Sequence, residues 1–438
     1  MLKVTKFGGS SLADAAQFRK VRDIVMADSD RKVVVVSAPG KRFLGDHKIT
    51  DLLYLCHAHL KYGVSAESVF DMIRSRYTSI RDELGLSLDL ESEFDALWKK
   101  MNQGISEAEL VSRGEYFSAR LMAAYLNFTF VDAASWLIFK PNGELDKESS
   151  YEMLRHLASE NKVVIPGFYG AMEDGHIYVM SRGGSDITGA YAAAALGADA
   201  YENWTDVSGI LMADPRIVPE AKSIPRITYS ELRELSYMGA QVLHEATVFP
   251  VREKDIPLNI RNTNDPSDPG TFIQEHFDDE PTDTSNFITG IAGKTGFLIF
   301  TISKAGMSSQ LGSLRKILEI FERYNVTISY APSGIDCYSI VVEEAQVENS
   351  RYSILADLKK EIQPDKIHVS ENISIVAVVG RKMAFRSGSS GKIFTTLGEN
   401  GINIRMISQG PEELNILIGV KEKDYRDAIR ILYRNFVK

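Results

Sequence analysis

The C-terminal third of the chain contains an internal repeat, which restricts the fold of that part more than any other feature of the sequence. VTISYAPSG (326–334) aligns with INIRMISQG (402–410) at an offset of 76 residues. The same offset relates the helical apolar patterns before these segments and the strand patterns after them, YSIVVEE (338–344) and LNILIGV (414–420). A helix followed by two short strands, present twice, predicts two copies of a small α+β unit. Chance similarity is the alternative, and the shared offset of helix, turn and strand favours duplication.

The remainder of the chain alternates strand-like and helix-like patterns up to about residue 275, which is typical of a layered α/β domain. Val33 to Val36 are apolar without alternation, as expected for a central strand that is covered on both faces. Further strands are predicted at 127–133, 162–170, 176–180 and 257–263. The polar segment 264–271 is expected to close this domain, and the acidic segment 276–286 to be a linker.

Length and composition narrow the class of protein. A chain of 438 residues is too long for one core, so roughly two to four domains are expected. The net charge of −9, without a basic stripe, argues against nucleic acid as a partner. The two cysteines, Cys56 and Cys337, support neither a disulfide scaffold nor a zinc cluster. No apolar run approaches the ~20 residues that span a bilayer, and no signal-peptide core is present, so a cytoplasmic enzyme or regulator without a membrane partner is expected.

A glycine-rich segment, KFGGSS (6–11), lies between a strand-like segment and an amphipathic helical pattern. Ser11 and Asp14 form a loose capping box for that helix. Adjacent glycines let the backbone approach a ligand, and the N-terminus of a helix favours an anion. An ordinary strand-to-helix turn explains this segment equally well, because it matches neither a Walker A motif nor a dinucleotide fingerprint.

A second glycine-rich turn, SRGGSD (181–186), lies between another strand pattern and an alanine-rich helix, with Arg182 and Asp186 flanking its glycines. Two such loops can meet at the carboxyl ends of the strands of an open α/β sheet. Together they would bring a lysine, backbone donors, an arginine and a carboxylate to one cleft. That combination suits a phosphoryl donor facing an anionic acceptor, because phosphoryl transfer depends mainly on positioning and charge neutralisation.

Two further segments contain candidate polar contacts. A helix over 112–126 has Arg113 and Glu115 in its first turn, where Glu115 could serve only to complement the helix dipole. The loop at 204–221 is rich in Thr, Asp, Ser, Gly and Pro. These residues could serve only to form turns, or the loop could bind a nucleotide, with Asp206 and Asp214 as polar contacts and Arg216 binding its phosphates.

Eight motifs follow one another along the chain: KFGGSS, VVVVSAPGK, SRGE, PGFYG, SRGGSD, WTDVSGILMADPR, MGAQVLHEATVFPV and IRNTNDPSDPGT. In this order and approximate spacing the chain resembles the aspartate kinases of the amino acid kinase superfamily over nearly its whole length. The resemblance implies a three-layer α/β sandwich, the amino acid kinase-like catalytic domain, over 1–280. Two α+β (ferredoxin-like) ACT domains would follow, the first (305–368) being inserted into the second (288–304 plus 369–438).

The resemblance also implies an activity, which is transfer of the ATP γ-phosphoryl group to the β-carboxylate of L-aspartate, the first step of lysine, threonine and methionine biosynthesis. Mg²⁺ would accompany ATP, without a dedicated metal site on the protein. Lys6 would neutralise the moving phosphoryl group, and Asp186 would hold Lys6 and organise Mg-ATP. The implied ATP contacts are Lys6, Gly8, Gly9, Ser10, Thr205, Asp206, Asp214 and Arg216. The implied aspartate contacts are Thr50, Phe168, Ser185, Arg182 for the α-carboxylate and Glu115 for the ammonium group.

Two positions depart from the family pattern. AQVLHE (240–245) has Gln241 where the family commonly has a lysine that reaches ATP phosphate, which puts the nucleotide contacts in question. Ser10 replaces a common threonine and keeps the hydroxyl group. The chemistry needs no general base, because the acceptor carboxylate, with an ordinary pKa of ~3.9, is already ionised at neutral pH. His244 is therefore expected to be structural.

Paired ACT-like units imply an amino acid effector bound away from the active site. The resemblance places it between the first units of two subunits, lined by Met307, Gln310, Ser333 and Asp336. Lysine is the expected effector and threonine the alternative. Such a site requires a homodimer through the ACT domains, with a tetramer as a further option. A purely dimerising role for the repeat stays open.

The sequence is also compatible with other functions. A kinase of glutamate or N-acetylglutamate would share the fold, but SRGE, SRGGSD and the paired C-terminal units together disfavour it. A fused homoserine dehydrogenase is not expected, because no dinucleotide-binding segment follows. The alternative from another class is an amino acid sensor without turnover, which Gln241 supports and which Lys6 and Asp186 oppose.

Overall fold

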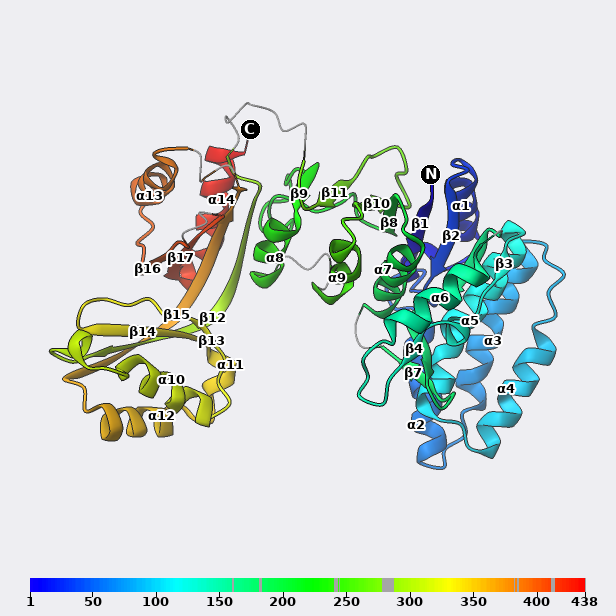
Figure 1. Ribbon diagram of the computed structural model, residues 1–438, viewed down its shortest axis with the longest axis horizontal. Coiled ribbons are helices and arrows are strands. Elements are labelled where there is room, and N and C mark those ends of the chain that lie inside the picture. Colours follow the sequence, from blue (N-terminus) through cyan, green and yellow to red (C-terminus); the bar gives the residue numbers. More distant parts are fainter. Residues whose placement is uncertain are drawn as a thin grey trace. The chain divides into compact units, whose positions relative to one another are not determined.

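The computed structural model describes residues 1–159, 161–180, 183–239, 243, 245–277, 287–381, 383, 386–410 and 414–437. It divides into two compact units (Figure 1). The first comprises Met1–Ile210, Ser223–Ser230 and Gln241–Asp278, and the second comprises Leu211–Lys222, Glu231–Ala240 and Asp279–Lys438. No helix in the described part of the chain is long and apolar enough to cross a membrane.

The first unit is built on an eight-stranded sheet with the order β3-β5-β2-β1-β8-β10-β11-β9. Its strands are β1 (Lys3–Phe7), β2 (Arg31–Val36), β3 (Thr129–Phe130), β5 (Val163–Pro166), β8 (Ala200–Thr205), β9 (Arg226–Thr228), β10 (Leu258–Asn262) and β11 (Thr271–Gln274). The five central strands from β5 to β10 are parallel, so their carboxyl ends lie along one edge. Val33 to Val36 are fully buried in β2, as the run of apolar residues predicts.

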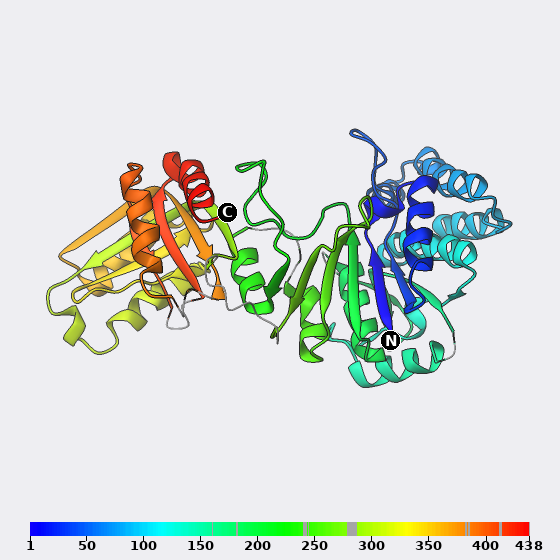
Figure 2. The same cartoon turned by 90° about the horizontal axis from the view of Figure 1, so that it is seen from above.

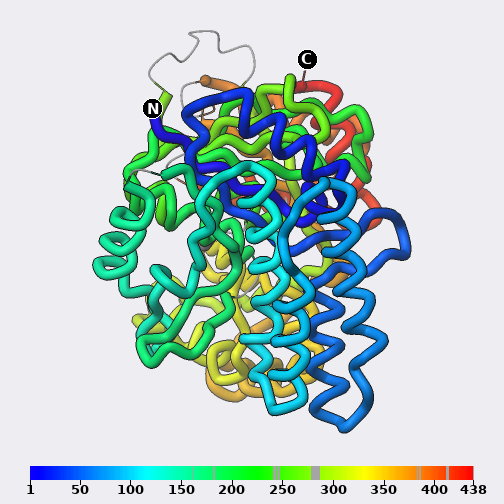
Figure 3. The backbone as a smooth tube through the Cα atoms, turned by 90° about the vertical axis from the view of Figure 1, so that its right-hand side faces the viewer, coloured from blue at the N-terminus to red at the C-terminus, as the bar shows by residue number. Residues whose placement is uncertain are grey.

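Helices cover both faces of this sheet (Figure 2). One layer contains α1 (Ala15–Met26), α2 (Ile49–Lys61), α3 (Glu67–Glu83), α4 (Glu91–Gln103) and α5 (Glu107–Leu126), and α2 to α5 run alongside one another in Figure 3. Phe7 packs into the core of this layer, whereas its neighbour Lys6 contacts α7 (Gly184–Leu196). Since neighbouring side chains of a strand point to opposite faces, α7 lies on the other face. There α6 (Lys147–Leu157) and α9 (Glu245–Glu253) pack against α7. The predicted three-layer α/β sandwich is therefore confirmed.

Several local predictions are corrected by the structure. The capping box is wrong, because Asp14 caps α1 by accepting the N–H of Gln17, while Ser11 lies in a preceding 3₁₀ helix, η1 (Gly9–Leu12). The single strand predicted at 162–170 is split into β5 and β6 (Tyr169–Met172), which belong to different sheets. Phe168, between them, has a left-handed backbone with φ of 75°, which ends the first strand.

The smaller sheet that contains β6 has the order β4-β6-β7, with β4 (Ile138–Phe139) and β7 (Ile177–Val179). The strand predicted at 127–133 shortens to β3. The predicted linker at 276–286 lies largely outside the described residues.

The second unit contains a six-stranded antiparallel sheet with the order β13-β14-β12-β15-β17-β16. The strands are β12 (Gly290–Ser303), β13 (Ile328–Tyr330), β14 (Cys337–Glu343), β15 (Lys366–Val379), β16 (Met406–Ser408) and β17 (Asn415–Lys421). Its helices include α8 (Tyr229–Tyr237), whose first two residues belong to the first unit, and α10 (Ser313–Arg323), α11 (Glu344–Val347), α12 (Arg351–Asp357), α13 (Ser389–Glu399) and α14 (Tyr425–Phe436). One core packs α10 and α12 on the sheet, and a second core packs α13 and α14 on it.

The internal repeat is visible in these elements, with a difference in spacing. Helices α10 and α13 begin 76 residues apart, at Ser313 and Ser389, as predicted. Strands β14 and β17 begin 78 residues apart, at Cys337 and Asn415, but their buried side chains keep the predicted offset of 76, since Ile340 and Val342 correspond to Ile416 and Ile418. The difference is therefore confined to the ends of the strands.

Candidate functional site

The loops that carry the glycine-rich motifs meet at the carboxyl edge of the large sheet. The chain leaves β1 at Gly8, whose N–H donates to the carbonyl of Trp204 at 3.0 Å. It leaves β2 at Ser37, whose N–H donates to the carbonyl of Phe7 at 3.2 Å, and it leaves β5 at Gly167, whose N–H donates to the carbonyl of Val36 at 2.9 Å. These bonds bring segments from distant parts of the sequence to one edge, where open α/β sheets bind ligands.

Lys6 and Asp186, which the sequence places in different glycine-rich segments, form an ion pair with 2.5 Å between Nζ and Oδ1. Asn203 on β8 joins them, because its Nδ2 donates to Asp186 Oδ1 at 3.0 Å and its Oδ1 lies 3.4 Å from Lys6 Nζ. Tyr201 donates its hydroxyl to the backbone carbonyl of Asp186 at 3.0 Å. The Lys6 side chain is only 9% exposed, so its charge is held in one position.

Glycine is required where the loops after β1 and β2 touch. The Gly40 N–H donates to the Gly9 carbonyl at 2.8 Å. A Cβ atom on Gly40 would lie 2.7 Å from the carbonyl carbon of Gly9, and one on Gly9 would lie 2.9 Å from the Ala38 carbonyl oxygen. Both distances are shorter than a van der Waals contact, so a side chain at either position would push the two loops apart. Gly8 and Ser10 flank this contact.

Glu115 is a buried carboxylate without a cationic partner among the described residues. The N–H of Ala38 donates to its Oε1 at 3.1 Å, while Oε2 is buried and receives no hydrogen bond within the described part of the chain. Burial raises the pKa of Glu115 to about 8. A desolvated acid of this kind favours a bound cation as its partner.

The role of Glu115 as a complement to the helix dipole is ruled out by the start of its helix. The predicted helix began at residue 112, but α5 begins at Glu107 with Ser106 as its N-cap. Glu115 therefore lies beyond the first turn, where the dipole effect has fallen off. Tight packing of Gly114 against Ala38 and Leu53 fixes this part of α5 beside the loop after β2.

Other predicted aspartate contacts lie on the neighbouring segments. Thr50 is the second residue of α2. Phe168 donates its N–H to the hydroxyl of Thr188 on α7 at 3.1 Å, and its ring covers Gly184, where a Cβ atom would lie 2.8 Å from it. The Ser185 side chain lies against Gly167. Arg182, Gln241 and His244 lie outside the described residues.

The predicted nucleotide loop is divided between the two units. Thr205 ends β8 and Asp206 follows it in the first unit, where the Thr205 hydroxyl donates to Asp206 at 3.2 Å. Asp214 and Arg216 belong to the second unit. There the Arg216 guanidinium binds both carboxylate oxygens of Asp214, at 2.7 to 3.1 Å, and holds the pKa of Asp214 below its ordinary value.

Asn203 and the Ala38 N–H are site groups that the sequence analysis missed. Asn203 pairs with Lys6 across the parallel strands β1 and β8. Its signal in the sequence is an amide within the buried strand that precedes the WTD motif. The Ala38 N–H has no such signal, because backbone donors are present at nearly every position.

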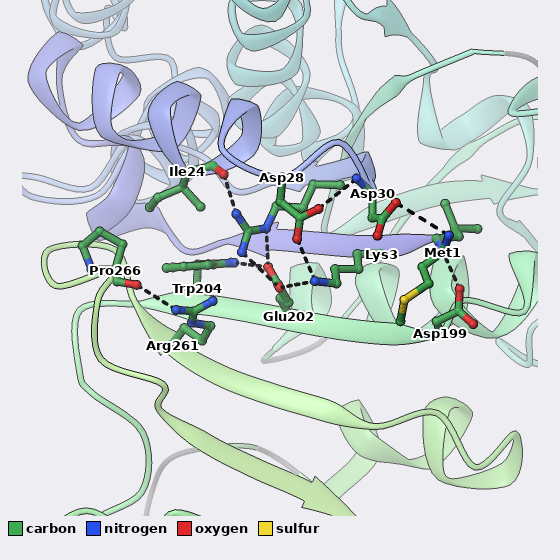
Figure 4. Close-up of polar contacts among 12 residues, drawn as sticks. Met1, Lys3, Ile24, Asp28, Asp30, Asp199, Glu202, Trp204, Arg261 and Pro266 are labelled. Atoms are coloured by element: carbon green, nitrogen blue, oxygen red, sulfur yellow. Dashed lines mark hydrogen bonds and ion pairs between the residues drawn. The ribbon is translucent and has the colours of Figure 1, made fainter.

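Figure 4 shows a buried ionic cluster around Glu202 and Trp204 of β8. These side chains lie on the face opposite Asn203, because they alternate with it along the strand. Arg31 binds the carboxylate of Glu202 through two nitrogens, at 2.8 and 3.2 Å. The Trp204 indole N–H donates to the same carboxylate at 2.9 Å, and the Arg261 guanidinium lies 4.5 Å from the Trp204 ring centroid. The cluster therefore links β2, β8 and β10, the strands that carry Arg31, Glu202 and Arg261, through side-chain contacts.

Glu202→Ala is expected to lower the free energy of unfolding of the first unit by about 3 kcal/mol, because it leaves the buried Arg31 charge uncompensated. All three tryptophans, Trp98, Trp136 and Trp204, lie in the first unit, so their fluorescence in urea follows its unfolding. Glu253→Ala, which breaks an exposed pair with Lys147, is the control and should cost less than about 1 kcal/mol. Equal losses in the two variants would contradict a special role for the buried cluster.

Comparisons with known proteins agree with this geometry. The model of the amino acid kinase family matches residues 1–262, and an ACT domain model matches residues 376–436. Aspartokinase 3 of Bacillus subtilis is 36% identical over 451 residues, which cover 99% of this chain and 98% of the relative. Aspartokinase 1 (chloroplastic) of Arabidopsis thaliana is 28% identical and is covered to 80% of its length.

Solved structures show the same similarity over the full chain. The aspartate kinase of Clostridium acetobutylicum superposes with a TM-score of 0.91 at 46% identity and covers 99% of both chains. Aspartokinase III of E. coli was crystallised with aspartate and ADP in an R-state and with lysine and aspartate in a T-state. Both of its structures have a TM-score of 0.73 at 26% identity over 100% of both chains.

Proposed function

Since the chain belongs to the amino acid kinase family and is an aspartate kinase, we propose that the edge carrying Lys6 and Glu115 transfers the ATP γ-phosphoryl group to the β-carboxylate of L-aspartate. The product is 4-phospho-L-aspartate, which begins lysine, threonine and methionine biosynthesis, and we place the reaction in the cytoplasm. The observation that carries this proposal is the Lys6–Asp186–Asn203 contact at the carboxyl edge of the parallel sheet.

The transfer requires charge neutralisation and not proton removal. The β-carboxylate of aspartate, with an ordinary pKa of ~3.9, is ionised at neutral pH and can attack without a base. Lys6 offsets the repulsion between this carboxylate and the phosphoryl oxygens, and Asp186 and Asn203 keep its ammonium group in place. The backbone of Gly8, Gly9 and Ser10 forms the cradle for the ATP phosphates. Thr205 and Asp206 complete the proposed nucleotide contacts of the first unit.

Aspartate binds through groups of both signs. Glu115 takes the ammonium group, which gives its buried carboxylate the cationic partner that it lacks among the described residues. Arg182 takes the α-carboxylate. Thr50, Phe168 and Ser185 form the walls, and the packing of Phe168 on Gly184 holds two of these segments together.

Mg²⁺ fits this site as an ion that enters with ATP. The residues that the structure describes include no cluster of three or more His, Cys, Asp or Glu side chains that could bind a metal by themselves. Mg²⁺ commonly takes one or two carboxylates together with phosphate oxygens and water. Asp186 suits that role, because Lys6 and Asn203 both contact its Oδ1 and its side chain is 20% exposed. When bound, the ion would neutralise phosphate charge.

The proposed activity is tested by ATP-dependent formation of aspartyl hydroxamate by the purified protein with Mg²⁺, with glutamate in a parallel reaction. Activity with aspartate and little with glutamate supports the proposal. A preference for glutamate, or no turnover by folded protein with saturating ATP, would reject it.

For the C-terminal unit we propose two ACT domains, with the first (305–368) inserted into the second (288–304 plus 369–438). Strands β12 and β15 flank the first in the sequence and pair with each other along most of their fourteen residues. Each is long enough to serve both cores of the sheet. We further propose a homodimer through these domains, or a tetramer, with lysine as effector and threonine as the alternative.

The proposed effector contacts, Met307, Gln310, Ser333 and Asp336, belong to the segment 305–368 that we propose as the first ACT domain. The Ser308 hydroxyl lies 3.5 Å from Asp336 Oδ1, and Lys304 donates its N–H to the Asp336 carbonyl at 3.0 Å. Gln310, Ser333 and Asp336 are exposed, whereas the Met307 side chain is buried in the hydrophobic core.

Asp336→Ala is expected to raise the lysine concentration for half-inhibition at least tenfold, since a carboxylate–ammonium contact is lost. The kcat without lysine should stay within twofold of the wild-type value. Inhibition curves with lysine and threonine measure this, with the exposed Glu348→Ala as control. An unchanged lysine response in Asp336→Ala would remove Asp336 from the effector site.

A further inference from the structure

Arg76 lies outside the eight sequence motifs, yet its guanidinium contacts three separate segments of the chain. It extends from α3 and its side chain is 5% exposed. Its Nη1 donates to the carbonyl of Gly40 at 3.1 Å and to that of Ala13 at 3.4 Å. Its Nη2 donates to both carboxylate oxygens of Asp46, at 2.8 and 3.0 Å.

The segments that Arg76 holds are those that form the proposed substrate sites. Gly40 is the residue whose N–H binds Gly9 in the proposed phosphate cradle, and Ala13 follows the 3₁₀ helix of that loop. On the other side of Gly40, the Ala38 N–H binds Glu115, and the Pro39 carbonyl accepts the N–H of Ile49, which precedes Thr50. One buried side chain therefore holds the junction between the loop proposed for ATP and the loop proposed for aspartate.

The carboxylate of Asp46, which Arg42 also binds, holds the Arg76 guanidinium in this position. Asp46 receives a second guanidinium, since Arg42 Nε and Nη2 donate to it at 2.9 and 3.1 Å. Arg42 and Arg76 hold the pKa of Asp46 well below its ordinary value, so the carboxylate stays charged. A buried ion pair is by itself weak evidence for a stabilising role, because apolar residues of similar size often replace one without loss. The hydrogen bonds from Nη1 to the carbonyls of Gly40 and Ala13 indicate that Arg76 positions these loops instead of mainly stabilising the fold.

We propose that Arg76 is a positioning residue, which keeps the glycine loop after β1 in register with the segment after β2 and so aligns the phosphoryl donor with its acceptor. The inference rests on the proposed function of these loops. A shift of about 1 Å between reacting groups can lower a rate about a hundredfold. Loss of Arg76 should thus appear in kcat at saturating substrates and much less in the KM values.

The test measures kcat, both KM values and tryptophan-monitored unfolding for Arg76→Met and Arg76→Lys. We expect Arg76→Met to lower kcat about 30- to 100-fold with both KM values within about threefold of wild type. Arg76→Lys should recover part of the lost kcat, because an ammonium group can still reach one of the acceptors. Arg81→Met is the matched control on the same helix, where Arg81 binds Glu91 and the Leu88 carbonyl away from the loops. Its kcat should stay within twofold of the wild-type value.

A second variant keeps the inference testable if Arg76→Met does not fold. Gly40→Ala leaves the buried charges in place but forces Gly9 and Gly40 apart, and it should lower kcat in the same pattern. Wild-type kcat in a folded Arg76→Met or Gly40→Ala protein would overturn the inference, as would an equal loss in Arg81→Met. Failure of the wild-type protein to phosphorylate aspartate would instead reject the proposed function, so the two failures are distinguishable.

Discussion

Replacing Lys6 with alanine is expected to lower kcat about a thousandfold while the protein stays folded. A single preorganised donor or cation at a developing charge contributes about 10²–10³ to a rate, and cations that act on a transferring phosphoryl group contribute up to about 10⁵. Lys6 is held by Asp186 and Asn203 before any substrate arrives, so its contribution needs no rearrangement. The hydroxamate assay at saturating ATP and aspartate measures the effect.

The matched control for Lys6→Ala is Lys3→Ala on the same strand. Lys3 pairs with Asp28 at 2.7 Å and is more exposed than Lys6. Its removal should leave kcat within about twofold of the wild-type value. The kcat of Asp186→Asn should lie between those of Lys6→Ala and Lys3→Ala, because the ammonium group of Lys6 would keep only Asn203 as a partner. A Lys6→Ala enzyme with more than a tenth of the wild-type kcat would show that Lys6 is not the principal cation.

Glu115→Gln is expected to raise the KM for aspartate on the order of a hundredfold, since the ammonium group of the substrate would lose a charged partner in a buried position. The wild-type KM should also depend on pH. Below a pKa of about 8 the ligand-free carboxyl is mostly protonated, so KM should fall about tenfold per pH unit from pH 6 to 7 and level off above pH 8. Glu115→Gln should lose this dependence.

Binding of aspartate near pH 7 should therefore release a proton from Glu115. Isothermal titration calorimetry in buffers of different ionisation enthalpy measures this release, with Glu107→Gln, an exposed position on the same helix, as control. The free energy of unfolding of the ligand-free protein provides an independent test of the raised pKa of Glu115. The folded state binds this proton more tightly than the unfolded chain, so stability should decrease as the pH rises from about 5 to 8, and less so in Glu115→Gln. A KM for aspartate that is independent of pH would contradict the proposed ammonium contact.

The parts of the site that lie within single motifs were predictable from the sequence. The glycine loop after β1 and the α/β layering follow from local patterns and are confirmed. The second glycine-rich segment is described only from Gly183, and its residues from Gly184 onward already belong to α7. The errors lie at element boundaries and in the segment 162–170, which forms two strands of different sheets. The start of α1 at Ala15 and the start of α5 at Glu107 depend on which polar residue finally caps the helix. Local sequence offers several capping candidates, and packing selects one of them.

Among the contacts between distant segments, the family resemblance implied the Lys6–Asp186 pair, but the sequence did not specify the others. Asn203 meets Lys6 across 197 residues because β1 lies between β2 and β8, and alternation of strands and helices does not specify that order. Arg76 gave no signal, since its partners include two backbone carbonyls, which every residue carries. The raised pKa of Glu115 arises from burial by α5 and the loop after β2, which is a property of the packed structure.

The sequence by itself determined the class of this protein, because glycine turns, hydrophobic periods and the repeat are short-range patterns whose physical meaning is local. It determined the α/β layers, the two α+β copies and the family. Only the tertiary structure decided which further groups join the Lys6–Asp186 pair, how far Glu115 is desolvated and which side chain joins the two substrate loops. Those properties depend on strand order and close packing, through which residues far apart in the chain exclude water and come within hydrogen-bond distance.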